Sequence, residues 1–515
     1  MKKLAPVVLL GLVLTFAGTA RAEVQFGVTE DAGKYADDGG AAFFATLGDL
    51  GMTQNRIVVF WNPDEPATIQ EKAFLDRSMP QAALLGTRIL FSVQPAHPTD
   101  VTSTPNGPQL FAAYTALLAR TYPQVKDFVV GNEPNQPRFW QPQFVGGKGV
   151  SAATYEQTLA LSYDALKDVD PTITVIGLGL SPRGNDSPNA PSNVSTSPVR
   201  FIRDLGAAYR ASGRTRPIMD QLAFHPYPNP SSADDPLTKG YQWPNAGVPN
   251  LGRIKQAFWD AFHGTAQPTF AEGGGGSRRL ASSGAAAPVS FVLDETGWQT
   301  AIPGAERAAY TGLENSKTVT EAVQAKIYGN LIRRVECDPG VASLNFFHLV
   351  DEVALAGFQS GLIRADGSRR ASYDSVKAAI ADSGGECLGR EAGWKHMTTV
   401  DGVRANFAAR MQTRYGFAVT ADEGATFRAG IFRAGAKRGL AERDRDAIGS
   451  ALARNGAAAG LVSRASGAVR AYWQNDVAFA ARSLAPGRYV YAVRIAAETN
   501  PGRTSVLVGE PFRVR

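Results

Sequence analysis

Short β-branched runs alternate with longer segments of helical period from Val24 to about Gly385 of this 515-residue chain. The runs are apolar on both faces, which is typical of buried parallel strands. Parallel strands need helical crossovers, and eight of them close a (β/α)8 barrel. We therefore predict an α/β fold with a (β/α)8 TIM barrel, whose eight strands lie at 24–28, 56–60, 88–93, 127–130, 173–178, 221–224, 289–293 and 343–347.

A doubly wound open sheet is the rival fold. Such a sheet usually carries a Gly-rich phosphate loop after its first strand, and Gly27-Val28-Thr29-Glu30 is not one. The same observation predicts no organic cofactor. With 2 Cys and 5 His, and no His-x-His after the first strand, we also expect no metal site.

The alternation stops after Gly389, and short extended runs take its place. They lie at 415–419, 426–432, 468–473, 489–495 and 504–508. Antiparallel runs separated by turns are typical of a β-sandwich. We therefore predict a barrel domain over 23–390 and an accessory β-sandwich-like domain over 391–515.

Charge divides the chain in the same place. The whole chain has a formal net charge of +6, but residues 391–515 hold 19 Lys and Arg against 10 Asp and Glu. Residues 23–390 are acidic, which disfavours nucleic acid as a partner. The basic domain suits weak binding to an anionic polysaccharide or the cell envelope, although a solvated Arg-rich surface explains the charge equally simply.

The N-terminus has the three parts of a secretory signal peptide. Lys2 and Lys3 precede an apolar run at 4–18, and Ala20-Arg21-Ala22 provides a cleavage signal. We predict a signal peptide at 1–22 and a secreted or periplasmic protein without a membrane span after cleavage. An N-terminal anchor is the alternative. Export permits a Cys337–Cys387 disulfide, the other possibility being two free thiols.

Polar side chains follow the predicted strands where the strands end. Two glutamates are among them, Glu133 after the fourth strand and Glu295 on the seventh. The strand ends of a barrel meet at one mouth, and two carboxylates there suit glycoside hydrolysis. Asp294 competes with Glu295, but strand alternation should turn Asp294 to the other face. The remaining candidates at strand ends are Arg56, Gln94, His97, Asn132, His225 and Tyr227.

These residues resemble a known family. Asn132-Glu133-Pro134 on the fourth strand, with Glu295 on the seventh, resembles the clan A glycoside hydrolases. The run Gly131-Asn132-Glu133-Pro134-Asn135, followed by Phe139-Trp140, is most similar to family 39. The resemblance covers residues 24 to about 385 and implies a retaining (β/α)8 enzyme.

The resemblance implies a role for each residue. Glu133 would be the general acid/base and Glu295 the nucleophile. Asn132 would bind the substrate 2-hydroxyl, and Tyr227 and Arg56 would hold Glu295 ionised and oriented. His225 would line the site, and Gln94 and His97 are further candidates for substrate binding.

One departure from the family concerns the sugar platform. The eighth strand region, 344–352, contains no Trp, although clan A barrels often place one there. Trp298 or Trp140 would then stack on the sugar, with Phe347 or His348 as the alternatives.

The predicted function is that of an exported retaining glycoside hydrolase. It would cleave β-glycosidic bonds of an oligo- or polysaccharide by double displacement, without a cofactor. Two alternatives stay open. One is a non-catalytic carbohydrate-binding or envelope barrel, and the other is a transglycosylase that uses the same site.

Overall fold

The computed structural model describes residues 23–229, 237–273, 287–408, 414–435, 442–454 and 459–515. The predicted signal peptide, residues 1–22, lies outside these ranges. Within them, no helix combines the length and apolar character that a membrane crossing requires. The disulfide prediction is confirmed: Cys337 and Cys387 are bonded, with their Cα atoms 4.6 Å apart.

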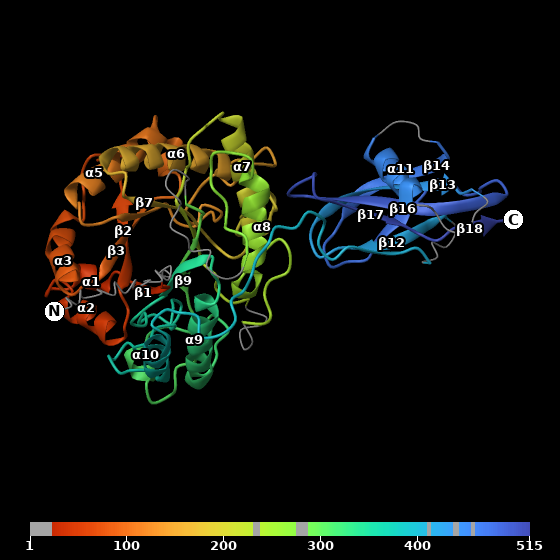
Figure 1. The fold of residues 1–515 in the computed structure, drawn as a ribbon. Coiled ribbons are helices and arrows are strands. Elements are labelled where there is room, and N and C mark those ends of the chain that lie inside the picture. Colours follow the sequence, from red (N-terminus) through yellow and green to blue (C-terminus); the bar gives the residue numbers. More distant parts are fainter. Residues whose placement is uncertain (1–22, 230–236, 274–286, 409–413, 436–441, 455–458) are drawn as a thin grey trace, which may run out of the picture.

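Eight parallel strands form a closed barrel, as predicted (Figure 1). The last strand pairs with the first, which closes the sheet. In order around the barrel the strands are β1 (Gln25–Thr29), β10 (Val341–Phe346), β9 (Phe291–Thr296), β8 (Gln221–Phe224), β7 (Thr174–Leu180), β4 (Asp127–Val130), β3 (Arg88–Pro95) and β2 (Gln54–Trp61).

Helices follow the strands and cover the outside of the barrel. Their starts carry the expected signals: Ser197 accepts a hydrogen bond from the backbone N–H of Arg200, and Thr320 accepts one from that of Val323. The helices are α2 (Ala41–Asp49), α3 (Lys72–Leu84), α5 (Gly107–Thr121), α6 (Ser151–Val169), α7 (Pro198–Ala211), α8 (Leu251–Phe262), α9 (Glu321–Glu336) and α10 (Ala371–Ser383). Short elements in the loops are α1 (Ala32–Tyr35), α4 (Asp100–Ser103), β5 (Phe144–Val145) and β6 (Lys148–Gly149).

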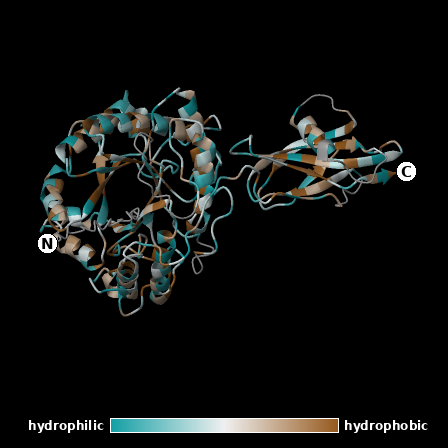
Figure 2. Cartoon of the chain, viewed as in Figure 1, coloured by the Kyte–Doolittle hydropathy of each residue, from teal (hydrophilic) through white to brown (hydrophobic). Residues whose placement is uncertain are grey.

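The barrel has two apolar layers. One large core fills the space between the strands and the helices. A separate small cluster takes one residue from each of five strands and plugs the barrel interior, namely Leu90, Val129, Ile176, Ala223 and Val292. Figure 2 shows hydrophobic residues along these strands. Since this layer closes the interior, polar side chains one or two positions further along each strand lie at the mouth.

The C-terminal domain consists of two antiparallel sheets that share one core. The first contains β11 (Arg404–Asn406), β12 (Gly416–Thr420) and β15 (Asn475–Ala478). The second contains β14 (Leu461–Val469), β13 (Ala425–Arg433), β16 (Gly487–Ala497), β17 (Thr504–Val508) and β18 (Phe512–Val514). The predicted β-sandwich architecture is therefore confirmed.

Two local predictions for this domain are wrong. The run at 468–473 is not a strand, because β14 ends at Val469 and the chain turns, with Tyr472 at φ 61°. Helix α11 (Glu442–Ala453) was not predicted; its side of the sheet has a small core of its own with Phe432, Leu452 and Val490.

A buried ion-pair cluster joins the two domains. Arg503 lies with its Nε 3.1 Å from Asp260 Oδ2, on α8 of the barrel. Its Nη2 lies 2.6 Å from Glu423 Oε2, in the C-terminal domain. All three side chains are buried, so the C-terminal domain packs beside α8 through a desolvated contact (Figure 1).

Candidate active site

The strand ends bring six of the predicted polar residues together at the mouth of the barrel. They come from β2, from the loop after β4, from the segment after β8, and from β9. Direct contacts link them into one network, whose members are Arg56, Asn132, Glu133, His225, Tyr227 and Glu295.

Arg56 is the cation at the centre of this network. Its guanidinium is 1% exposed and has three partners. Nη1 donates to Glu295 Oε1 at 2.7 Å, Nη2 donates to Asn132 Oδ1 at 2.7 Å, and Nε lies 2.9 Å from Asp294 Oδ2. A planar guanidinium that donates from both Nη atoms holds Glu295 and Asn132 in fixed directions.

His225 lies between the two predicted catalytic glutamates. Its Nδ1 is 3.0 Å from Glu133 Oε1 and 3.5 Å from Glu295 Oε2. The distance between those two carboxylate oxygens cannot exceed the sum of their distances from His225 Nδ1, so they are at most about 6.5 Å apart. Carboxyl groups about 5–5.5 Å apart are typical of retaining glycosidases, and wider spacing is typical of inverting ones.

Solvent access separates the carboxylates. The side chains of Glu133 and Glu295 are 15% and 11% exposed, and that of Asp294 is fully buried. Tyr227 donates its hydroxyl proton to Glu295 Oε2 at 3.0 Å. A substrate can reach Glu133 and Glu295, whereas Asp294 lies beneath them.

The argument from strand alternation that placed Asp294 on the opposite face is wrong. Between β9 and β10, Leu293 pairs with Leu344 and Thr296 pairs with Phe346, so β9 holds one extra residue there. Such a bulge lets two consecutive side chains point to the same side. Asp294 therefore shares Arg56 and His225 with Glu295.

The backbone around Glu133 is held by its neighbours. Glu133 has a φ of 36°, in the left-handed region that non-glycine residues rarely adopt, and its N–H donates to the carbonyl of Gly179 at 2.9 Å. The side-chain nitrogen of Asn135 donates to the carbonyls of Ser181 and Thr196, and its Oδ1 accepts a hydrogen bond from the N–H of Ser181. These bonds tie the loop after β4 to the loop after β7 and so orient Glu133.

Burial and neighbouring charges shift the pKa values of His225, Asp294 and Tyr227. Burial opposes the charged form of His225, but the charges of Glu295 and Asp294 and its hydrogen bonds raise its pKa to about 10. Burial would raise the pKa of Asp294, but His225 and Arg56 hold it below the usual value. Burial and the charge of Glu295 raise the pKa of Tyr227 well above its usual value, so Tyr227 stays a donor.

The prediction that Trp298 or Trp140 stacks on the sugar is wrong. Both are 1% exposed, in the core between strands and helices. Trp140 donates to Thr154 Oγ1 at 3.0 Å and packs edge-on against Tyr155, while Trp298 packs against Tyr328. A ring that is enclosed in this way has no face free for a sugar.

Three other aromatic rings, those of Tyr227, Phe347 and Phe358, pack together at the mouth. Phe347 packs edge-on against Tyr227, with centroids 6.1 Å apart, and against Phe358, at 4.9 Å. Phe358 is 40% exposed. Phe347 was one of the alternatives predicted from the sequence. Phe358 was missed, because it lies in an irregular loop 12 residues after β10.

The two candidates on the third strand have different positions. Gln94 is buried, and its amide donates to Ser92 Oγ at 3.0 Å. The prediction that His97 binds substrate is wrong, because its side chain is 78% exposed and lies 3.4 Å from Asp100. The loop after β3 turns His97 outward, away from the carboxylates.

Glu30 and His348 form a second polar pair at the mouth. The sequence analysis named His348 only as an alternative sugar platform and did not assign Glu30 to the site. His348 Nδ1 lies 2.9 Å from the carbonyl oxygen of Thr29 and 3.4 Å from Glu30 Oε2. Burial raises the pKa of Glu30, although His348 partly offsets this. The available signal was position, because Glu30 directly follows the first strand and His348 comes two residues after the eighth.

The described residues contain no group of three or more His, Cys, Asp and Glu side chains arranged to hold a metal ion. The described side chains at the mouth are carboxylates, the buried Arg56 and His225, and aromatic rings.

Comparisons with known proteins add the following. No protein-family model matches the chain, and no curated protein matches it. Several of the solved structures to which the chain is similar are glycoside hydrolases. A family 39 glycoside hydrolase from Bacteroides cellulosilyticus WH2 has 15% identity and a TM-score of 0.46, over 89% of this chain and 81% of that one.

Two further structures are of the same kind. A monomeric beta-xylosidase from Caulobacter crescentus CB15 has 16% identity and a TM-score of 0.43, over 88% of this chain and 93% of that one. An endo-1,4-beta-mannanase from Rhizomucor miehei has 14% identity and a TM-score of 0.42, over 70% and 96%. Because these identities are low, we base the proposed function on the side chains of this chain.

Proposed function

We propose that this protein is a retaining glycoside hydrolase that cleaves β-glycosidic bonds of an oligo- or polysaccharide. The observation that carries the proposal is the position of His225, within 3.5 Å of both Glu133 and Glu295. It keeps the two carboxylates close together, and a short spacing favours a mechanism in which one of them acts as nucleophile. Both carboxylates are reachable from solvent at the mouth.

Glu295 is the nucleophile in this mechanism. Arg56 and Tyr227 each bind one of its carboxylate oxygens and orient it toward the anomeric carbon. Attack forms a bond between a Glu295 oxygen and the anomeric carbon, and the bond to the leaving oxygen breaks. Asp294 does not take this role, because its side chain is fully buried.

Glu133 is the general acid and then the general base. It gives its proton to the leaving oxygen and later removes one from the water that releases the sugar. Arg56 and His225 lie within ion-pair distance of the three carboxylates of Glu133, Asp294 and Glu295 and hold them in place. Asn132, fixed by Arg56, is placed to bind the sugar 2-hydroxyl.

Export is also part of the proposal. It is supported by the N-terminal pattern at 1–22 and by the Cys337–Cys387 disulfide, since disulfides persist in oxidising compartments. A secreted or periplasmic place suits an enzyme that meets polysaccharide outside the cytoplasm.

The test uses the mature protein with Glu295→Gln, Glu133→Gln and Glu386→Gln. Glu386 is an exposed carboxylate after α10, at the opposite end of the barrel, and serves as the matched control. Aryl β-glycosides and polysaccharides are the substrates, and released sugar and the first-formed anomer are measured by NMR. We expect retention of the β-anomer, losses of at least about 10³-fold in the two site variants, and no loss in the control.

A 2-deoxy-2-fluoro β-glycoside with a good leaving group should label Glu295, located by peptide mass. Equal activity of Glu295→Gln and the parent protein would overturn the assignment of the nucleophile. Sugar transfer to an added acceptor, with no free sugar released, would support the transglycosylase. Binding without turnover of any substrate would support the non-catalytic barrel.

A further inference from the structure

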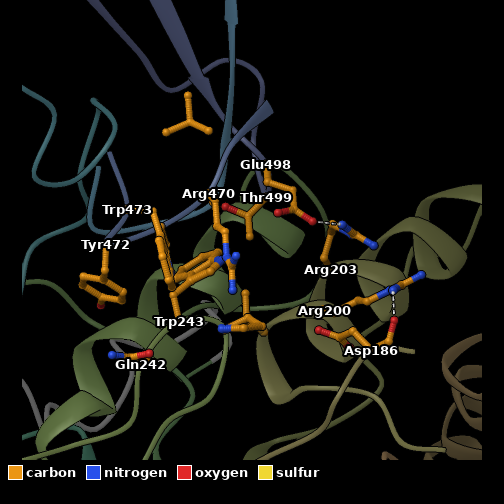
Figure 3. Close-up of a pocket in the computed structure, with 15 residues that line it drawn as sticks. Asp186, Arg200, Arg203, Gln242, Trp243, Arg470, Tyr472, Trp473, Glu498 and Thr499 are labelled. Carbon is orange, nitrogen blue, oxygen red and sulfur yellow. Dashed lines mark hydrogen bonds and ion pairs between the residues drawn. The ribbon is translucent and has the colours of Figure 1, made fainter. Parts of the chain in front are cut away.

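A second pocket lies between the barrel and the C-terminal domain, with a volume of about 340 Å³. The barrel contributes helix α7 and the loops after β7 and β8, and the C-terminal domain contributes the turn after β14 and the segment after β16. Figure 3 shows Trp243, Arg470 and Trp473 on one side of this pocket and Arg200 and Arg203 on the other.

Aromatic rings of the C-terminal domain are presented at this pocket. Trp473 is 55% exposed and Tyr472 is 43% exposed, which is unusual for rings of this size on one short turn. The turn is held in place: Tyr472 has a φ of 61°, and its N–H donates to the carbonyl of Ala421 at 2.8 Å. A tyrosine keeps this conformation only where its surroundings hold it.

The barrel completes the aromatic wall. Arg253 of α8 lies 5.7 Å from the ring of Trp243, and its Nη2 donates to the Tyr472 hydroxyl at 2.8 Å. Gly424 makes room for Trp243, because a Cβ at this position would lie 2.8 Å from the indole nitrogen. The two domains therefore build the wall jointly, from side chains with fixed positions.

The pocket also holds a positive charge without a carboxylate partner. Arg203 is paired with Glu498 at 2.9 Å, and Arg200 donates to the backbone carbonyl of Asp186. Arg470 is exposed and stacks over Trp473, with its guanidinium 4.3 Å from the ring centroid. Within the described ranges of the chain, the Arg470 side chain forms no ion pair.

The half-exposed indole of Trp473 and the Arg470 guanidinium stacked over it, which forms no ion pair among the described residues, together suit one class of ligand. The apolar C–H face of a sugar ring packs on an aromatic ring, and a guanidinium binds a carboxylate through two charge-assisted hydrogen bonds. We propose that this pocket binds a carboxylated saccharide, a uronic acid unit of an acidic oligosaccharide, on Trp473 and Arg470. This site goes beyond the proposed hydrolase function, because it holds a sugar without cleaving it.

The pocket is lined by loops that begin at the barrel mouth. Trp243 lies in the loop between β8 and α8, the same loop that begins with His225 and Tyr227. Asp186, which also lines the pocket, lies in the loop between β7 and α7. Loops after barrel strands all lie at the end of the barrel that carries the carboxylates. The pocket and the active site therefore open from the same end of the molecule.

The test measures binding to the full-length Glu295→Gln protein, so that turnover plays no part. The probes are oligomers of galacturonate, mannuronate and glucuronate, together with their neutral methyl esters, and titration calorimetry gives the Kd. We expect at least one acidic oligomer to bind about tenfold more tightly than its ester. Added Trp473→Ala or Arg470→Gln should each weaken this binding about tenfold, and Arg470→Gln should abolish the preference over the ester.

Phe74→Ala and Arg77→Ala are matched controls. They remove an exposed ring and an exposed arginine that pair at 5.5 Å on α3, away from this pocket. We expect both to bind like the parent, with unchanged melting temperatures throughout. The proposal is overturned if no acidic oligomer binds, or if Trp473→Ala and Arg470→Gln bind the acidic oligomer as tightly as the parent protein does. Equal binding of acid and ester would overturn the carboxylate assignment. None of these results depends on catalysis.

Discussion

Asp294 lies directly against Arg56 in the barrel, with its Oδ2 2.9 Å from the arginine Nε and both side chains buried. The bulge in β9 makes this contact possible, because it turns Asp294 and Glu295 to the same side. Asp294 thereby contacts Arg56, whose Nη1 and Nη2 donate to Glu295 and Asn132. We regard Asp294 as a positioning residue.

Replacing Asp294 with Asn tests this role. The variant removes the fully buried carboxylate that Arg56 and His225 share, so we expect the free energy of unfolding to fall by about 3–5 kcal/mol. We also expect kcat to fall more than KM changes, because Glu295 loses its fixed orientation. Denaturant titration and steady-state kinetics measure both effects. Asp382→Asn, an exposed carboxylate on α10, is the control and should change neither. A stable, fully active Asp294→Asn protein would contradict the positioning role.

The charge of His225 predicts a dependence of stability on pH. Its pKa is about 10 in the folded protein, against an ordinary value of 6.5. A group whose pKa rises on folding contributes stability that is fully present below its unfolded pKa and is lost as the pH rises through the folded one. We therefore expect the free energy of unfolding to fall between pH 6.5 and pH 10, measured by urea titration at each pH.

His225→Gln provides the comparison for this prediction. The variant cannot gain or lose a proton at this position, so its alkaline decline should be smaller than that of the parent protein. At acid pH the sign is reversed for Asp294, whose pKa is lowered in the folded state, and stability should fall as the pH drops through its ordinary value of 3.8. Identical alkaline slopes in the two proteins would show that His225 is neutral at pH 7.

The aromatic residues divide into core and mouth, and mutation should separate them. Trp140→Ala removes an enclosed ring and should lower the free energy of unfolding by about 3–5 kcal/mol. Phe358→Ala removes a ring that is 40% exposed at the mouth. We expect it to raise KM about tenfold with little change in stability, if a sugar stacks there. A normal KM in Phe358→Ala would place the sugar platform elsewhere.

Arg503 should control how the two domains unfold. Replacing it with Met leaves Asp260 and Glu423 buried without their partner, which should cost about 3–5 kcal/mol. Scanning calorimetry should then show the barrel and the C-terminal domain unfolding as separate transitions. Arg513→Met, at an exposed position on β18, is the control and should leave the parent profile unchanged. A single unshifted transition in Arg503→Met would mean that the domains are joined by other contacts.

Much of the active site could be predicted because barrel topology converts order along the chain into position. Glu133, His225, Tyr227 and Glu295 each lie at or just after the end of a strand, and parallel strands bring all such ends to one mouth. Arg56 lies near the start of β2, where it pairs with Thr29 at the end of β1. The contacts among these residues can be predicted once the strands are assigned correctly. Trp140 and Trp298 could not be placed in this way, because a residue in the loop after a strand can turn inward to the core or outward to the ligand.

The amino-acid sequence by itself determined the alternation of strands and helices, the change to an antiparallel C-terminal domain, and the set of polar residues at the barrel mouth. These follow from local periodicity and from residue type. Only the tertiary structure decided that Asp294 joins the site, that His97 leaves it, and that Trp243 and Trp473 face one pocket. Each of these depends on a bulge, a loop path or a domain contact, which arises from packing between segments far apart in the chain.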